Sequence, residues 1–306
     1  KERSGMDMGE KGYGTFASNK TFRYSLENSG YGVREISLEH PVAEDINIIV
    51  LADMRSDFTE EEFRNFDAYL ERGGNLFILG EPKRQQFMNP VIERLGLRFA
   101  DGIIVSPSEV NLDDLVAANI KEGAAKVSEN YIRYFRSGYS IMTPSACVVE
   151  VIDPNKGFEI TEVLASADKG SWVEKETTDF INEKSVLNPA VGEVEKSNSI
   201  MLYLTRPVNN KEQRIFVIGD ADCISTLELS QNRPGFRSSN FTLITETFRN
   251  LSYGEFPVEA SRVNPPDDRV LVTRNVIFGI RVVLMWIIPL LFVTGCITLL
   301  IRRKRR

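Results

Sequence analysis

Four acidic side chains stand where the chain is predicted to leave buried strands. Asp53, Glu81 and Asp220 each follow the end of an apolar run, and Asp222 comes two residues later. In open parallel sheets, ligands bind at the edge formed by the carboxyl ends of the strands. Carboxylates that converge there could hold Mg²⁺ or Ca²⁺. The more ordinary role of such residues is to cap the next helix or accept hydrogen bonds from loop amides. We therefore take these four as candidate ligand or metal residues.

Other reactive side chains are few. His40 is the single histidine and precedes Pro41 in a loop, where a catalytic triad is not expected. Cys147 falls in a predicted strand and Cys223 follows Asp222, so neither has the nucleophile-and-histidine arrangement of covalent catalysis. The two could form a disulfide or remain buried free thiols. The sequence has no phosphate-binding loop and no zinc-type spacing, so we expect no cofactor.

A strand–helix–strand unit must position the first two carboxylates. The run at 46–52 reads as a strand buried on both faces, and 75–79 reads as another. Between them, Thr59 and Glu62 have the spacing of a capping box, and an apolar helical face follows until Gly73-Gly74. This unit predicts parallel strands with a right-handed crossover.

The remaining elements of the outer part are predicted from periodicity and turn residues. Helices are expected at 20–29, 86–95 and 240–251, and strands at 32–38, 102–105, 146–152, 158–165, 199–204 and 214–218. Residues 107–140 have a polar helical pattern, and 166–198 are loop-rich.

The C-terminal end differs from the rest of the chain. Residues 282–301 carry no charge, and at 1.5 Å per residue they span about 30 Å, the thickness of a bilayer core. Trp286 lies near the entry side, and Pro289 predicts a kink. The segment ends in five basic residues, Arg302, Arg303, Lys304, Arg305 and Arg306. These keep the C-terminus cytoplasmic, so the large domain is expected outside the cytoplasm.

Composition and charge exclude several classes of protein. With 42% hydrophobic and 26% charged residues, the 306-residue chain is neither collagen-like, broadly disordered nor a multi-spanning bundle, and three cysteines exclude a disulfide scaffold. The net charge of −6 divides into −11 for the first 281 residues and +5 for the rest. The acidic outer part argues against nucleic-acid binding. The basic tail could contact anionic lipid or an ATPase, or serve only as an orientation signal.

These patterns predict five regions. They are a flexible arm at 1–20, an α/β domain at 21–258 with an insertion at about 107–198, a linker at 259–275, a transmembrane helix at 276–301 and a cytoplasmic tail at 302–306. The chain begins at Lys1 without a signal segment, so we expect an upstream segment to deliver the domain across the membrane.

The order of short motifs resembles one known family. They are Thr59-Glu60-Glu61-Glu62, Arg72-Gly73-Gly74-Asn75, Gly80-Glu81-Pro82, Asn89-Pro90, Leu95-Gly96-Leu97, Ser171-Trp172 and the run from Arg214 to Asp222, followed by a proline-containing terminal helix with a basic tail. Over residues 3–306 this resembles the GldG-like family, the extracytoplasmic auxiliary domain of ABC-type transport systems associated with gliding motility. The resemblance implies a flavodoxin-like or glutamine-amidotransferase-like α/β domain with a parallel sheet core.

The resemblance also implies a function. The chain would be a non-enzymatic auxiliary or permease component in a bacterial inner membrane, with an ABC ATPase and permease helices as partners. Its outer domain would bind a substrate, an envelope component or a partner protein. The alternative is a membrane-anchored hydrolase or metal-dependent enzyme that uses the acidic cluster at the strand ends.

Overall fold

The chain divides into two compact units, each described by itself. The computed structural model describes residues 12–19, 22–23, 25–233, 235–257 and 274–305. The first unit is Lys1–Val258 and the second is Glu259–Arg306. The predicted linker falls mostly on 258–273, outside the described residues, as do residues 1–11 of the predicted arm and Arg306 of the tail.

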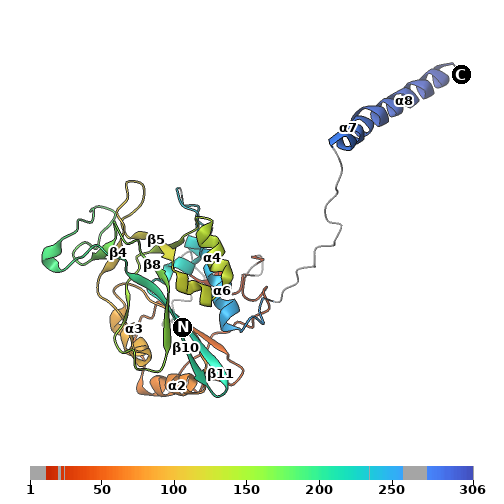
Figure 1. Cartoon of the computed structure of the whole chain (residues 1–306). Helices are drawn as coiled ribbons and strands as arrows, with labels where there is room; N and C mark the ends of the chain where they lie inside the picture. Colours follow the sequence, from red (N-terminus) through yellow and green to blue (C-terminus); the bar gives the residue numbers. More distant parts are fainter. Residues whose placement is uncertain (1–11, 20–21, 24, 234, 258–273, 306) are drawn as a thin grey trace. The chain divides into compact units, whose positions relative to one another are not determined.

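A seven-stranded sheet forms the centre of the first unit (Figure 1). In spatial order its strands are β1 (Ile48–Ala52), β2 (Asn75–Leu79), β11 (Lys211–Ile218), β10 (Ser199–Val208), β8 (Glu159–Ala165), β5 (Leu115–Ile120) and β6 (Ile141–Pro144). The pairs β1–β2 and β2–β11 are parallel, and every other neighbouring pair is antiparallel. The parallel core predicted from the sequence is therefore present and spans three strands of a mixed sheet.

Two short antiparallel ladders and several short helices complete the first unit. The ladders pair β3 (Leu97–Phe99) with β7 (Val149–Val151) and β4 (Ile103–Val105) with β9 (Trp172–Glu174). The α-helices are α1 (Gly14–Ala17), α2 (Glu60–Glu71), α3 (Gln85–Ile92), α4 (Glu129–Arg136), α5 (Thr226–Ser230) and α6 (Asn240–Leu251). The 3₁₀ turns are η1 (Glu93–Leu95), η2 (Glu122–Lys126), η3 (Pro189–Val191) and η4 (Asp222–Ile224).

Both faces of the central strands are buried, which explains their unbroken apolar runs. Leu76 and Ile78 of β2 pack in one hydrophobic cluster with α2 and α3. Their neighbours Phe77 and Leu79 pack in the other, with α4 and α6. Because side chains alternate across a strand, a strand covered on both faces must be apolar at every position.

The capping box predicted for α2 is confirmed. The Thr59 side chain accepts from the backbone N–H of Glu62, and a Glu62 carboxylate oxygen accepts from the backbone N–H of Thr59 at 2.7 Å. The bounds predicted for α6, 240–251, are also those observed.

Two predicted elements near the N-terminus are wrong. Among the described residues, 22–30 form turns instead of a helix, and 32–38 form no strand in spite of their alternating pattern. Residues 12–19 differ from the predicted flexible arm, since they contain α1 and place Tyr13 and Phe16 in the core. An alternating segment becomes a strand only if another strand offers it hydrogen bonds. Residues 32–38 have no such neighbour in the described part of the chain.

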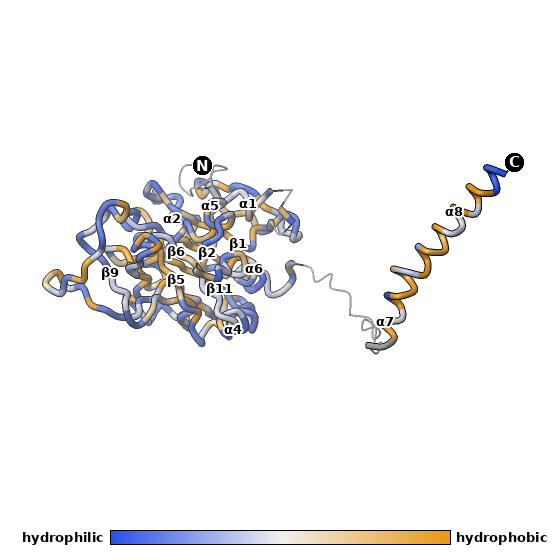
Figure 2. Tube along the Cα trace, turned by 90° about the horizontal axis from the view of Figure 1, so that it is seen from above, coloured by the Kyte–Doolittle hydropathy of each residue, from blue (hydrophilic) through white to orange (hydrophobic). Residues whose placement is uncertain are grey.

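The described part of the second unit, residues 274–305, is one long helix. Its parts are α7 (Arg274–Val282), the π-helical turn η5 (Val283–Ile287) and α8 (Ile288–Lys304). Residues 276–304 are long and apolar enough to cross a membrane, with a mean hydropathy of 2.6 in their most apolar window. Apolar residues lie on all sides of α8 up to its basic end (Figure 2). The π-turn ends two residues before Pro289, where the missing backbone donor favours such an irregularity.

Candidate functional site

The strand order brings the predicted acidic residues to one edge of the sheet. Asp53 follows β1, Glu81 follows β2 and Asp220 follows β11, and these three strands are parallel neighbours. Glu81 is close enough to Asp222 and Asp53 for their charges to raise its pKa. The four carboxyl groups therefore lie near one another at the carboxyl ends of these strands.

Asp53 is held as an ion pair in a strained backbone position. Its φ of +45° lies in the left-handed region, which costs a non-glycine residue about 1 kcal/mol or more. Arg55 donates to Oδ2 through Nε at 2.9 Å and Nη2 at 2.7 Å. Arg84 Nε lies 3.3 Å from Oδ1 without making a hydrogen bond to it. Two guanidinium groups therefore face this carboxylate from the solvent side.

Glu81 and Asp220 are buried acids whose environment favours the protonated form. Burial, and then the charges of Asp222 and Asp53, raise the pKa of Glu81 to about 9. Burial, and then Glu81 and Asp222, raise the pKa of Asp220 well above its usual range. Glu81 therefore keeps its proton at neutral pH, because burial and the neighbouring carboxylates disfavour its charged form, and the same causes shift the pKa of Asp220 in the same direction.

Asp220 also has the ordinary role that the sequence suggested. Its Oδ1 accepts from the backbone N–H of Asp222 at 2.7 Å and of Cys223 at 3.3 Å, which orders the first turn of η4. The second oxygen, Oδ2, has no hydrogen-bond partner in the described structure. Asp53 Oδ1 and Glu81 Oε2 are buried without a hydrogen-bond partner in the same way. The unpaired oxygens of Glu81 and Asp220 are thus available to a ligand, whereas Asp53 Oδ1 faces the guanidinium of Arg84.

Tyr13 covers this edge and was not recognised from the sequence. Its side chain is only 2% exposed, and burial together with the charges of Asp222, Asp53, Glu81 and Asp220 raises its pKa. Thr226 of α5 holds the segment by donating its backbone N–H to Gly12 O at 2.7 Å and accepting from the Thr15 N–H at 3.3 Å. The available signal was the pair of aromatic residues, Tyr13 and Phe16, spaced three apart in a polar stretch.

The geometry does not match a metal site built from the described residues. No group of three or more His, Cys, Asp or Glu side chains in that part of the chain is arranged to hold a metal ion.

The two cysteines of the first unit, Cys147 and Cys223, are free and inert in this structure. Cys147 donates its thiol proton to Gly219 O and Cys223 donates to Asp220 O, each at 3.2 Å. Burial, and then nearby carboxyl groups, raise the pKa of both thiols well above the usual range. The thiolate required of a nucleophile is therefore disfavoured. His40 is exposed, in the turn that follows Leu38.

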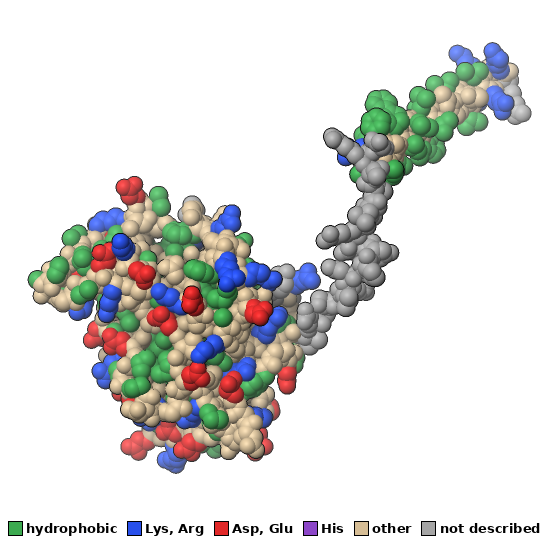
Figure 3. Space-filling view, in the orientation of Figure 1, with side chains coloured by type: hydrophobic (Ala, Val, Ile, Leu, Met, Phe, Trp, Pro, Cys, Tyr) green, Lys and Arg blue, Asp and Glu red, His purple; other side chains and the backbone are tan. Residues whose placement is uncertain are grey.

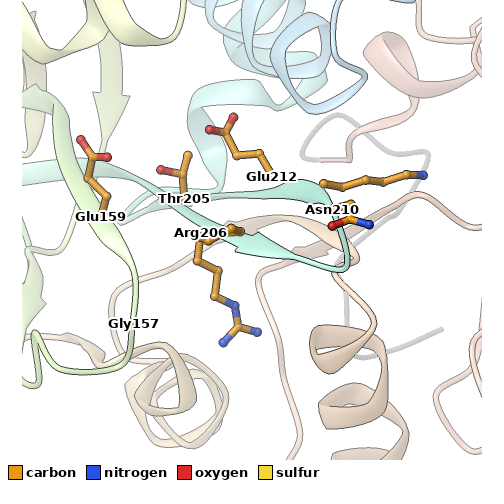
Figure 4. A pocket seen from close by; sticks show the side chains of 8 residues that line it. Gly157, Glu159, Thr205, Arg206, Asn210 and Glu212 are labelled. Atoms are coloured by element: carbon orange, nitrogen blue, oxygen red, sulfur yellow. The ribbon is translucent and has the colours of Figure 1, made fainter.

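A separate hollow of about 550 Å³ lies on the β10–β11 hairpin, away from the strand ends (Figure 4). Arg206 extends to one side of the hairpin, while Thr205 and Glu212 lie on the other. The guanidinium of Arg206 already donates to Gln213 Oε1 at 2.7 Å and Leu70 O at 3.1 Å, and lies over the Phe158 ring. The guanidinium of Arg206 is thus already paired within the fold and does not require a ligand.

The fold and these sites define an α/β domain joined to a single candidate membrane helix. The chain belongs to the family described as an ABC-type uncharacterized transport system, whose model matches residues 7–251. It is therefore an auxiliary component of an ABC-type transport system. No curated protein matches its sequence.

Solved structures with a related fold have low sequence identity. The mmIFT52 N-terminal domain is 16% identical with a TM-score of 0.55, and the match covers 82% of this chain and 96% of that one. A putative ThuA-like protein from Bacteroides uniformis is also 16% identical, with a TM-score of 0.44 over 80% of this chain and 88% of that one. The first likeness supports the fold and says nothing of activity.

Proposed function

We propose that the outer domain is a non-catalytic binding component of its transport system and that the edge of β1, β2 and β11 receives the bound group. The observation that supports this most is the set of three buried carboxyl oxygens, on Asp53, Glu81 and Asp220, that have no hydrogen-bond partner in the described structure. Buried polar atoms are normally paired, so an unpaired group of them favours a site where a partner supplies donors.

The bound group would carry N–H or O–H donors, and a cation would suit the site best. A cation next to Glu81 would favour its charged form and offset the repulsion from Asp222 and Asp53. Such a group could belong to a substrate, an envelope component or a partner protein. Because Tyr13 covers the edge, binding requires its ring to move or the ligand to pack against it.

The chain would act together with an ABC ATPase and permease helices in a bacterial inner membrane. The apolar helix at 276–304 would anchor it, with Trp286 and Pro289 inside the anchor. The basic residues at 302–306 would keep the C-terminus cytoplasmic and the outer domain on the opposite side, where anionic lipid could bind the tail. Catalysis by a thiol has little support, because Cys147 and Cys223 are buried and donate to backbone carbonyls.

Co-purification tests the assembly. The full chain, extracted from its native membrane in mild detergent, is expected to bring down an ATPase whose ATP hydrolysis is vanadate-sensitive. A protein that repeatedly purifies alone would contradict the proposal.

Variants of the acidic edge test the binding role. Asp53→Asn and Glu81→Gln keep the shapes of the side chains; the first removes a charge and the second removes the ability to ionise when a cation binds. If the edge binds a cationic group, both variants are expected to reduce the effect that the outer domain has on the rate of ATP hydrolysis. Glu60→Gln, an exposed carboxylate in the first turn of α2, is the matched control. Unchanged hydrolysis in all three variants would remove the strand edge from the function.

A further inference from the structure

A second polar cavity lies at the opposite ends of the same strands. It has a volume of about 350 Å³ and is lined by residues from η2, α4, α6 and the start of β11. Arg214, near the beginning of β11, takes part in it, whereas the carboxyl groups described above follow the strand ends. The cavity is therefore separate from the acidic edge.

Three residues of α6 supply the principal groups of this cavity. Glu246, Arg249 and Asn250 are spaced three and four apart, so they share one face of the helix. Glu246 is 5% exposed and accepts from Ser128 Oγ at 2.5 Å and Asn130 Nδ2 at 2.9 Å. These two bonds orient the carboxylate and leave it capacity for further donors, because each oxygen has two lone pairs.

Two buried polar atoms of the cavity have no partner in the described part of the chain. They are Arg249 Nε, which must donate, and Asn250 Oδ1, which must accept. Asn250 is 8% exposed, and its Nδ2 already donates to Val127 O at 3.2 Å. The Asn250 side chain also makes a hydrogen bond with Tyr203, which opposes the raised pKa of that tyrosine, while Oδ1 itself has no hydrogen-bond partner. An unpaired buried donor and an unpaired buried acceptor on residues that line the same cavity favour one ligand with both kinds of group.

Arg214 adds a second guanidinium that is already rigid. It donates through Nη1 to Asn250 O at 2.7 Å and through Nε to Glu212 Oε1 at 2.8 Å, and it lies over the Tyr253 ring at 4.5 Å. A guanidinium has five N–H donors, so others remain for an anion. The cavity thus has cationic donors in Arg249 and Arg214, and acceptors in Glu246 and Asn250.

We propose that this cavity binds the ammonium and carboxylate groups of a small α-amino acid. The carboxylate would accept from Arg249 Nε and Arg214, as guanidinium groups pair well with carboxylates. The ammonium group would donate to the Glu246 carboxylate and Asn250 Oδ1. The volume is near the lower end for small-molecule sites, and the lining is largely polar, which suits a small zwitterion more than an apolar ligand.

Glycine is the direct probe, titrated into the full chain in detergent micelles by calorimetry and by thermal unfolding. Glycine is expected to bind and to raise the melting temperature. Acetate and methylammonium, which each carry half of its charges, are expected to bind about tenfold or more weakly. Inorganic phosphate controls for a site that binds any anion. The proposal would be overturned if glycine does not bind. It would also be overturned if acetate or phosphate binds as tightly as glycine.

Variants locate the binding. Arg249→Gln and Glu246→Gln each remove one charged partner and are expected to weaken glycine about tenfold or more. Arg249→Lys keeps the charge without the Nε–H group and is expected to bind with intermediate affinity. Arg98→Gln is the control. Arg98 lies on β3, outside the cavity, and pairs with Glu93. Circular dichroism without ligand identifies the variants that are folded. Glycine binding of wild-type strength in a folded Arg249 variant would refute the assignment.

Discussion

The backbone of Cys147 lies directly against Gly219, the residue that joins β11 to Asp220. The N–H of Cys147 donates to Gly219 O at 2.9 Å, and a Cβ on Gly219 would stand 1.9 Å from Cys147 O. No real Cβ approaches a carbonyl oxygen so closely, so only glycine fits at this position. The segment at Cys147 therefore sets how the chain turns from β11 into the acidic edge.

Gly219→Ala is expected to destabilise the outer domain by about 3 kcal/mol, because the backbone of β11 or of Cys147 must shift to admit the methyl group. Urea denaturation of the full chain in micelles, followed by circular dichroism, measures the effect. Gly32→Ala is the control, since nothing lies within 4 Å of its Cβ position and the backbone there is not left-handed. Equal stability of the two variants would show that the turn relaxes without cost.

The buried acids make stability depend on pH in a defined direction. Burial raises the pKa of Glu81 from 4.5 to about 9, so between these values the folded chain keeps a proton that the unfolded chain releases. The free energy of unfolding therefore falls as the pH rises from about 5 to 9, by at most about 1.4 kcal/mol per pH unit for this group. Asp220, whose pKa is also raised, acts in the same direction.

Glu81→Gln removes the titrating proton and is expected to flatten this fall in stability. Urea denaturation of wild type and variant at pH 5, 7 and 9 provides the comparison. A wild-type protein whose stability rises over this range, or a variant with an unchanged slope, would show that Glu81 is charged in the folded state.

The stability of the loop region after β9 depends on a buried ionised acid, Glu174. This stability changes with pH in the opposite direction to that of Glu81. Glu174 is 2% exposed; burial opposes its ionisation, but the N–H groups of Thr177 and Glu176 and the indole of Trp172 hold its pKa below the usual value. Its Oε1 accepts from the first two at 2.9 and 3.0 Å. The resulting stability is present above pH 4.5 and is lost as the pH falls through the lowered pKa.

Glu174→Gln is expected to weaken this region by about 1 to 3 kcal/mol at pH 7, because charge-assisted hydrogen bonds become neutral ones. Hydrogen exchange of the amides at 174–193 reports the change directly. Glu183→Gln, an exposed acid in the same region, is the matched control and should exchange like wild type. Identical exchange in Glu174→Gln would mean that shape alone maintains these loops.

Labelling of introduced cysteines tests the orientation in the membrane. Cys147 and Cys223 are 0% exposed, which keeps the background low. In right-side-out spheroplasts, Glu39→Cys in the exposed turn of the outer domain is expected to react with a membrane-impermeant maleimide, and Lys304→Cys only after lysis. The reverse pattern would place the large domain in the cytoplasm.

Figure 3 shows basic side chains gathered at the C-terminal end of the long helix, next to its apolar segment.

Elements with strong local signals could be predicted from the sequence. The capping box of Thr59 and Glu62 determines the start of α2 because both partners lie within one helical turn. The apolar runs of β1 and β2 and the helix between them predict a parallel pair, and they place Asp53 and Glu81 at one edge. The uncharged run at 282–301 likewise predicts the long apolar helix that the structure contains.

Tertiary structure decided which distant segments share an edge or a cavity. β11 is separated from β2 by more than 130 residues, yet it pairs with β2 and brings Asp220 to Glu81. Tyr13 covers this edge, and the second cavity combines η2, β11 and α6. Local periodicity shows which face of an element is apolar. It does not show which other element covers that face, because many apolar surfaces could pack against it. Only the packing of the whole chain selects among them, so unpaired buried atoms such as Arg249 Nε and Asp220 Oδ2 become visible only in the folded structure.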